Sequence, residues 1–209
     1  MFNDFNPETN GELFFINKIK NEIDIIFDVG AAESIYLNTE KEIHYFEPVP
    51  LFLNQLKDTK NKNKKSVFNN FGLSDNEETL DYYTTFQSFV NRSIDRKDSP
   101  KIQLSVKKGI NYMLENNIKK IGLLKIDTEG FELNVLKGFD DKLKDIKYIQ
   151  FEYGGTYKDN NIKLIDVVNY LKNFGFDGFS YLSNENFVPI LDFEDHYQFS
   201  NIICKNNNI

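Results

Sequence analysis

The apolar residues of this chain follow two spacings, one typical of buried strands and one typical of helices. Short apolar runs bounded by polar or turn-forming residues predict extended segments at 23–30, 43–48, 66–75, 80–86, 121–127, 146–153, 178–182, 187–191 and 199–205. Apolar residues three and four positions apart predict helices at 13–23, 33–38, 51–56, 106–114, 131–138 and 162–174.

Strands that alternate with helices in this way predict an α/β fold, with a mostly parallel sheet covered by helices on both faces. The pattern lapses over residues 87–100, which we interpret as a loop. We find no internal repeat and no linker. The expected organisation is therefore one domain over residues 1–209, with a helical lead-in at 1–22 and the α/β core at 23–205.

The composition agrees with a folded globular protein. Of the 209 residues, 40% are hydrophobic and 15% are aromatic, which argues against disorder. The net charge of -7 and the absence of a basic patch with interleaved aromatic residues argue against a nucleic-acid partner. The one dense basic run, KNKNKK at 60–65, is interpreted as a solvated loop.

The single cysteine, Cys204, excludes an intrachain disulfide and a metal site built from several cysteines. The first residues lack the basic and apolar regions of a signal peptide. No apolar run approaches the roughly 18 residues of a membrane span. We therefore expect a cytoplasmic protein without a membrane span, and the sequence leaves its oligomeric state open.

Acidic residues follow several of the predicted strands. In the stretch LLKIDTEGFELNVLKG, Asp127 ends a buried strand and precedes a helix, and Glu152 ends the strand at 146–153. Ligands of open α/β sheets bind outside the carboxyl ends of the strands, so these acids indicate an active site. The alternative for Asp127 is that it only caps the following helix.

The turn after the first strand combines an acid, Asp28, with Gly30 and the small residue Ala31, which let a ligand approach the backbone. About 19 residues further on, the second strand ends in Glu47. In nucleoside-binding folds an acid at this place accepts hydrogen bonds from ribose hydroxyls. The alternative is that Asp28 and Glu47 are solvated loop acids.

Other polar residues have competing interpretations. His44 lies within a strand and is interpreted as structural, whereas His196 is a weaker candidate for a catalytic base. Glu132 is expected on the helix surface as a partner of Lys137 or of another charged residue of the helix.

Two segments are candidates for contacts with a substrate. Residues 153–157 (YGGTY) form either the wall of an acceptor site or a tight glycine turn with surface tyrosines. The loop at 87–100 carries Arg92 and Arg96, which either close over an anionic acceptor or belong to a disordered segment.

Five short motifs resemble one family. FDVGA, YFEPVP, GLSD, LLKIDTEGFELNVLKG and IQFEY are similar to motifs of the FkbM family of S-adenosylmethionine-dependent methyltransferases, and the resemblance runs from about Phe27 to about Lys205. It implies a Rossmann-like class I methyltransferase fold with a seven-stranded sheet whose last strand is antiparallel. It also implies O-methylation of a sugar hydroxyl in a glycan, nucleotide-sugar or glycosylated metabolite.

The resemblance implies that Asp28 and Gly30 lie beside the methionine part of the cofactor, that Glu47 holds the ribose, and that Asp127 faces the methyl-transfer centre. The implied cofactor-binding residues are Asp28, Gly30, Ala31, Glu47, Leu73, Ser74, Asp75 and Asp127, with the GLSD residues near adenine. The first loop departs from the family pattern, because Ala32 replaces an asparagine and Ser34 a glycine. Cofactor affinity is the property that these two changes affect.

A sugar hydroxyl is barely acidic, so its methylation favours a general base. Asp127, Glu129 and Glu152 follow neighbouring strands and are the candidates for that base. The same three carboxylates could instead hold Mg²⁺, which we do not favour, and no metal ligands are assigned.

Two other functions stay open. One is methyl transfer to a lipid, a peptide or a small metabolite, and the other is a non-catalytic binding module that has kept the fold. A dinucleotide oxidoreductase fits poorly, because the phosphate-binding glycines are absent.

Overall fold

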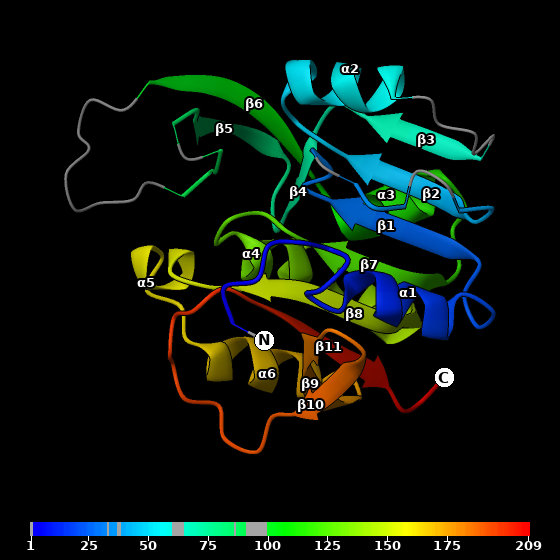
Figure 1. Cartoon of the computed structure of the whole chain (residues 1–209). Coiled ribbons are helices and arrows are strands. Elements are labelled where there is room, and N and C mark those ends of the chain that lie inside the picture. Colours follow the sequence, from blue (N-terminus) through cyan, green and yellow to red (C-terminus); the bar gives the residue numbers. More distant parts are fainter. Residues whose placement is uncertain (1, 33, 37–38, 60–64, 86, 91–99) are drawn as a thin grey trace.

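The computed structural model describes all residues except 1, 33, 37–38, 60–64, 86 and 91–99. Its centre is a sheet with the strand order β10-β9-β11-β8-β7-β1-β2-β3 (Figure 1). These strands are β1 (Ile25–Val29), β2 (Glu42–Phe46), β3 (Ser66–Asn69), β7 (Ile121–Ile126), β8 (Ile146–Tyr153), β9 (Phe176–Ser183), β10 (Asn186–Pro189) and β11 (Ser200–Asn206).

The five neighbouring strands from β3 to β8 run parallel. The last strand, β11, lies between β8 and β9 and is antiparallel to both. The predicted α/β class, the mostly parallel sheet and the antiparallel last strand are confirmed. The implied count of seven strands is one too low for the described residues, because β10 adds an edge strand that pairs with β9.

A second sheet was not predicted. It has the order β4-β6-β5 and consists of β4 (Gly72–Ser74), β5 (Glu78–Tyr83) and β6 (Lys101–Lys108). The predicted strand at 66–75 is therefore two strands in different sheets. The helix predicted to start near Ser105 begins instead at Gly109, because Val106 pairs with Gly72 and Glu78 in this second sheet.

The helices cover the main sheet unevenly. They are α1 (Glu12–Ile19), α2 (Pro50–Asp58), α3 (Gly109–Glu115), α4 (Glu132–Lys137), the 3-10 helix η1 (Asp140–Asp145), α5 (Thr156–Asp159) and α6 (Leu164–Lys172). Residues of α3, α4 and α6 belong to the larger apolar cluster on one face, and residues of α1 and α2 belong to the smaller cluster on the other. The prediction of a helix at 33–38 is not borne out at Ile35 and Tyr36, which form a turn, and Glu33, Leu37 and Asn38 lie outside the described residues.

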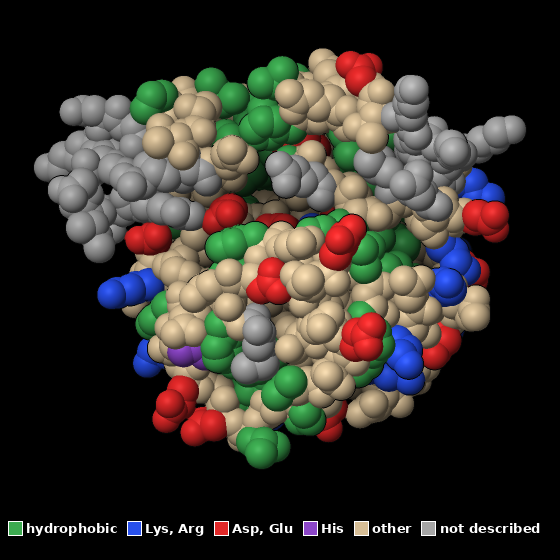
Figure 2. All heavy atoms as spheres, viewed as in Figure 1, with side chains coloured by type: hydrophobic (Ala, Val, Ile, Leu, Met, Phe, Trp, Pro, Cys, Tyr) green, Lys and Arg blue, Asp and Glu red, His purple; other side chains and the backbone are tan. Residues whose placement is uncertain are grey.

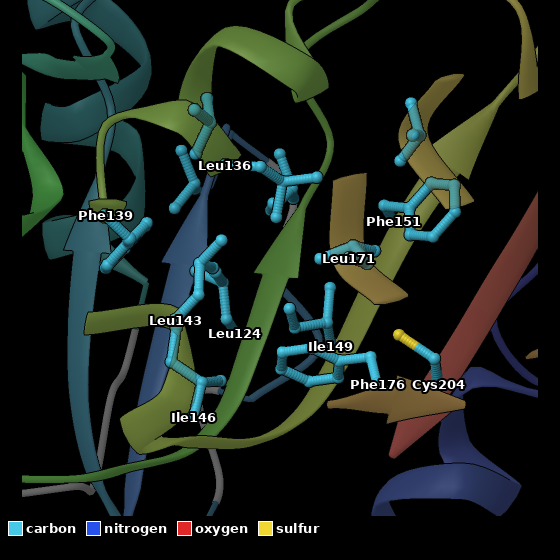
Figure 3. Close-up of a cluster of buried hydrophobic side chains, with 14 of the residues drawn as sticks. Leu124, Leu136, Phe139, Leu143, Ile146, Ile149, Phe151, Leu171, Phe176 and Cys204 are labelled. Carbon is cyan, nitrogen blue, oxygen red and sulfur yellow. The ribbon is translucent and has the colours of Figure 1, made fainter. Parts of the chain in front are cut away.

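The larger cluster joins the sheet to its helices (Figure 3). Leu124 and Ile149 come from the central strands, Leu136 from α4 and Leu171 from α6, and all four are fully buried. Cys204 lies in the same cluster as a buried free thiol. This packing fixes the strands whose carboxyl ends carry the acidic residues.

Among the described residues, no helix combines the length and the apolar character that crossing a bilayer requires. Two predicted loops fall largely on residues that the structure does not describe. Residues 60–64 of the basic run lie outside the described residues, as do 91–99 of the predicted loop, with Arg92 and Arg96.

Candidate functional site

A cavity of about 290 Å³ lies at the carboxyl ends of β1, β2 and β7, the edge where open α/β sheets bind ligands. The molecular surface is hollowed on this side of the molecule, and acidic side chains lie around the hollow (Figure 2). The charged lining residues are Glu47, Lys125, Asp127 and Glu129, and the aromatic ones are Phe46, Phe52, Tyr82, Phe89 and Phe131.

Gly30 permits the closest approach between two strand ends in this cavity. Its φ is +79°, and a Cβ atom built on it would lie 1.7 Å from the carbonyl oxygen of Asp127. The amide of Asp127 donates a hydrogen bond to the carbonyl of Val29 (2.9 Å), which holds the ends of β1 and β7 together. Only glycine fits here, because any side chain would separate the two turns that line the cavity.

Glu47 follows β2 and lines the cavity, although its side chain is only 3% exposed. The amide of Val49 donates a 2.8 Å hydrogen bond to its Oε1. Burial raises the pKa of this carboxyl to about 7, although the Val49 hydrogen bond opposes the shift. In its ionised form this buried carboxylate can accept hydrogen bonds from ligand hydroxyls.

Asp28 is fully buried and does not line the cavity. Neither of its oxygens has a partner in strict hydrogen-bond geometry among the described residues, although the nearby Ser34 side chain lowers its pKa. Burial raises its pKa, and the Lys125 ammonium, 3.8 Å from Oδ1, opposes the shift. Lys125, which sequence reasoning missed, is the residue that reaches the cavity at this point.

The three candidate bases converge. Asp127, Glu129 and Glu152 each place a carboxylate oxygen so that all three atoms lie within 4.8 Å of one another. Asp127 and Glu129 line the cavity, whereas Glu152, on β8, does not. The convergence expected from the strand ends is therefore present in the structure.

The members of this cluster differ in their affinity for a proton. Burial alone would raise the pKa of Asp127, but the Lys125 ammonium and a hydrogen bond with Glu152 hold it below its usual value. Burial and the neighbouring Asp127 charge raise the pKa of Glu152 well above its usual value. Of the two carboxyls, Glu152 therefore has the higher affinity for a proton and Asp127 the lower.

Glu132 is buried, so the prediction of a surface partner for Lys137 is wrong. Its Oε1 accepts hydrogen bonds from the amides of Thr128 (3.0 Å) and Gly130 (3.2 Å) and from the Thr128 hydroxyl (3.0 Å). Burial raises the pKa of Glu132 to about 7. This carboxylate, and not Asp127, accepts hydrogen bonds from backbone amides ahead of α4, whose N-cap residue Phe131 provides no side-chain cap.

Glu132→Ala should lower stability by about 2–4 kcal/mol, because it leaves one buried and two partly buried donors unpaired. Glu132→Gln keeps an acceptor oxygen and removes a buried charge. The raised pKa means that this carboxyl contributes stability below about pH 4.5, and that the contribution is lost as the pH rises through about 7. The stability of Glu132→Gln relative to the wild type, measured by thermal unfolding, should therefore increase between pH 5 and pH 8. Equal losses in both variants would contradict the hydrogen-bonding role.

The residues implied to surround adenine separate in the structure. Leu73 lines the cavity, whereas Ser74 and Asp75 line a neighbouring groove on the second sheet. There the Ser74 hydroxyl and the Asn134 amide donate hydrogen bonds to Asp75. Ala31 is buried against the smaller apolar cluster and does not line the cavity.

Sequence reasoning missed the aromatic wall of the cavity. The ring of Phe89 contacts Tyr82 (centroids 5.2 Å apart) and Phe131 (5.4 Å apart). Tyr82 and Phe89 come from the second sheet and the segment that follows β5, which no sequence pattern placed beside the DTEG turn. Lys125 did carry a signal, because a lysine inside an apolar strand requires a partner.

The remaining candidates have structural roles. His44 hydrogen-bonds Tyr112 (2.7 Å) and Glu42 (2.9 Å), as predicted for a structural histidine. His196 hydrogen-bonds Tyr181 (3.0 Å) and does not line the cavity. Tyr153 and Tyr157 are buried, so they form neither an acceptor wall nor surface tyrosines.

One protein-family model matches most of the chain. The model of the methyltransferase FkbM domain matches residues 22–177. A search of curated proteins finds no match.

The solved structures that resemble this fold are distant in sequence. An FkbM methyltransferase from Methylobacillus flagellatus KT has a TM-score of 0.51 and 14% identity, over 88% of this chain and 44% of that one. The fibrillarin pre-rRNA processing protein of Methanococcus jannaschii has a TM-score of 0.48 and 13% identity, over 97% and 77% of the two chains. SMU.1697c of Streptococcus mutans, solved in complex with SAH, has a TM-score of 0.46 and 11% identity, over 93% and 97%. The present chain thus spans less than half the length of the Methylobacillus protein.

Proposed function

The chain belongs to the FkbM methyltransferase family, and on that basis we propose that it transfers the methyl group of S-adenosylmethionine to a sugar hydroxyl of a glycan, nucleotide-sugar or glycosylated metabolite. The observation that carries the proposal is the convergence of Asp127, Glu129 and Glu152 beside a cavity that contains a buried acid, Glu47.

The cavity residues fit the proposed cofactor. The Glu47 carboxylate suits the two ribose hydroxyls, because it is desolvated and reaches the cavity. The Tyr82, Phe89 and Phe131 rings supply an aromatic surface of the kind that packs against a planar base. When bound, S-adenosylmethionine supplies a methyl group made electrophilic by the sulfonium charge.

The protein must position the acceptor oxygen and take up its proton. Methyl transfer forms a carbon–oxygen bond and breaks a carbon–sulfur bond, so alignment of the reacting atoms supplies much of the rate. Asp127 and Glu129 line the cavity, where either could receive this proton, and a hydrogen bond links Asp127 to Glu152. We propose that this cluster contains the general base.

The groove beside the cavity supports a polyhydroxylated acceptor. It shares the rings of Phe89 and Phe131 with the cavity, and its polar lining includes Asp75, Asn76, Glu78, Thr79, Asp81, Gln103 and Asn134. Carboxylates and amides suit sugar hydroxyls, which both donate and accept hydrogen bonds. Its acidic residues favour a neutral or amino sugar over an anionic nucleotide-sugar.

The experiment that tests this function incubates the purified protein with methyl-labelled S-adenosylmethionine and a panel of acceptors. The panel contains free sugars, glycans, nucleotide-sugars, a lipid mixture and peptides, and products are identified by mass spectrometry. Transfer to a sugar class supports the proposal, and transfer to a lipid, peptide or small metabolite alone overturns the acceptor. Cofactor binding without any transfer would favour a non-catalytic binding module.

Binding of S-adenosylmethionine should tighten by about tenfold between pH 6 and pH 8. The pKa of Glu47 is about 7 in the free protein, so its ionised fraction rises by about that factor, and ribose hydroxyls donate best to the ionised form. Titration calorimetry at both pH values measures this. Glu47→Gln should bind more weakly and lose the pH dependence, whereas the exposed control Glu40→Gln should retain both. An unchanged pH profile in Glu47→Gln would contradict the assignment.

A further inference from the structure

Lys125 is a buried cation at the wall of the cavity. It lies on β7, in register with Asp28 on β1 and Gln150 on β8, and it is only 5% exposed. Its neighbours along the strand, Leu124 and Ile126, are fully buried. A lysine in such surroundings is retained only when charged partners compensate for its burial.

Two nearby carboxylates supply most of the compensation, and the charge of Glu12 adds to it from further away. Lys125 Nζ lies 3.2 Å from Asp127 Oδ2 and 3.8 Å from Asp28 Oδ1. Only the Asp127 contact is within hydrogen-bond distance. An ammonium carries three N–H donors, so among the described residues two of them have no acceptor within hydrogen-bond distance.

The charged side chains that line the cavity are mostly acidic. Its described lining residues include three acids, Glu47, Asp127 and Glu129, and Lys125 is the one cation among them. A ligand that carries both an ammonium and a carboxylate can place its cation against several of these residues. The carboxylate of such a ligand has one cationic partner among the described lining residues, which is Lys125.

We propose that Lys125 binds the carboxylate of the amino-acid part of S-adenosylmethionine. This inference rests on the proposed function. It also changes the role expected for Asp28, which would not contact the methionine part of the cofactor directly. Asp28 is the counter-charge behind Lys125: it lies outside the cavity and keeps the ammonium charged and in place.

The first test uses the wild-type protein and removes the group from the ligand. Titrations compare S-adenosylmethionine with its decarboxylated form, which lacks only the carboxylate. The expected result is that decarboxylation weakens binding by about 10- to 100-fold, the usual range for a charge-assisted hydrogen bond. Equal affinity for the two ligands would overturn the assignment of Lys125 and leave the cofactor site intact. Binding of neither ligand would overturn the proposed function together with this inference.

The second test removes the cation. Lys125→Met should bind both ligands with similar affinity, because the group that distinguishes them is gone. The double variant Asp28→Asn/Lys125→Met removes both charges, so that no isolated buried carboxylate remains to prevent folding. The control Lys120→Met, at an exposed position before β7, should discriminate as the wild type does. A folded Lys125→Met or double variant that still prefers the carboxylated ligand would overturn the proposal.

Discussion

Removing the proposed general base from the Asp127–Glu129–Glu152 cluster is expected to lower kcat by about 100- to 10,000-fold, the range that general bases contribute. The variants are Asp127→Asn, Glu129→Gln and Glu152→Gln, which keep the size of each side chain and remove its ability to bind a proton. The exposed Glu185, in the turn between β9 and β10, provides the matched control Glu185→Gln. Turnover is measured with saturating cofactor and the acceptor that the panel identifies.

The pH dependence of kcat distinguishes the members of the cluster. The Asp127–Glu152 pair becomes a stronger base as it loses protons, and the pKa of Glu152 lies well above its usual value. If this pair is the base, kcat should rise with pH in the wild type, and Glu152→Gln should abolish the rise. If Glu129 is the base, Glu129→Gln should show the large loss and Glu152→Gln should keep the pH profile.

Two outcomes would contradict this mechanism. Near-wild-type turnover in all three variants would remove the cluster from the chemistry. Loss of turnover in EDTA, restored by Mg²⁺, would show that the carboxylates hold a metal ion, which three converging oxygen ligands also permit. Turnover that is unchanged in EDTA is the expected result.

Gly30→Ala should destabilise the protein by about 3–5 kcal/mol and abolish cofactor binding. The new methyl group would lie 1.7 Å from the Asp127 carbonyl oxygen, so the ends of β1 and β7 would have to separate. For a protein of this size the loss corresponds to roughly 6–20 °C in Tm. Thermal unfolding and titration with S-adenosylmethionine measure the two effects.

Gly178 provides the control for this substitution. It also has a positive φ (+64°), but a Cβ atom there would meet nothing within 4 Å. Gly178→Ala therefore tests the left-handed backbone alone and should cost only about 1 kcal/mol. If both variants lost the same stability, the close approach between the strand ends would not be the reason for Gly30.

The repeating spacing of apolar residues determined most of the elements. Strand positions rich in apolar residues, such as 121–127 and 146–153, were predicted because a strand buried on both faces needs no strict polar alternation. The acids at their ends were found because a polar residue directly after such a run marks the edge of the sheet. The KIDTEG motif added the family, which the domain match confirms.

The predictions failed where a contact joins residues far apart in the chain. Val106 fits a helical spacing with Ile110 and Met113, but pairing with Gly72 and Glu78 places it in a strand. Glu132 fits a surface position, but it is buried by the turn that it stabilises. Both cases show tertiary partners overriding a local pattern.

By itself the sequence determined the α/β class, the family and the acids that follow the strands, because strand period, turn residues and short motifs are local properties of the chain. Only the tertiary structure decided which of those groups meet. The register of β1 with β7 brings Asp28 and Lys125 together, and the burial of Glu47, Glu132 and Glu152 shifts their pKa values. Desolvation and charge pairing depend on distances in space, which a one-dimensional pattern does not contain.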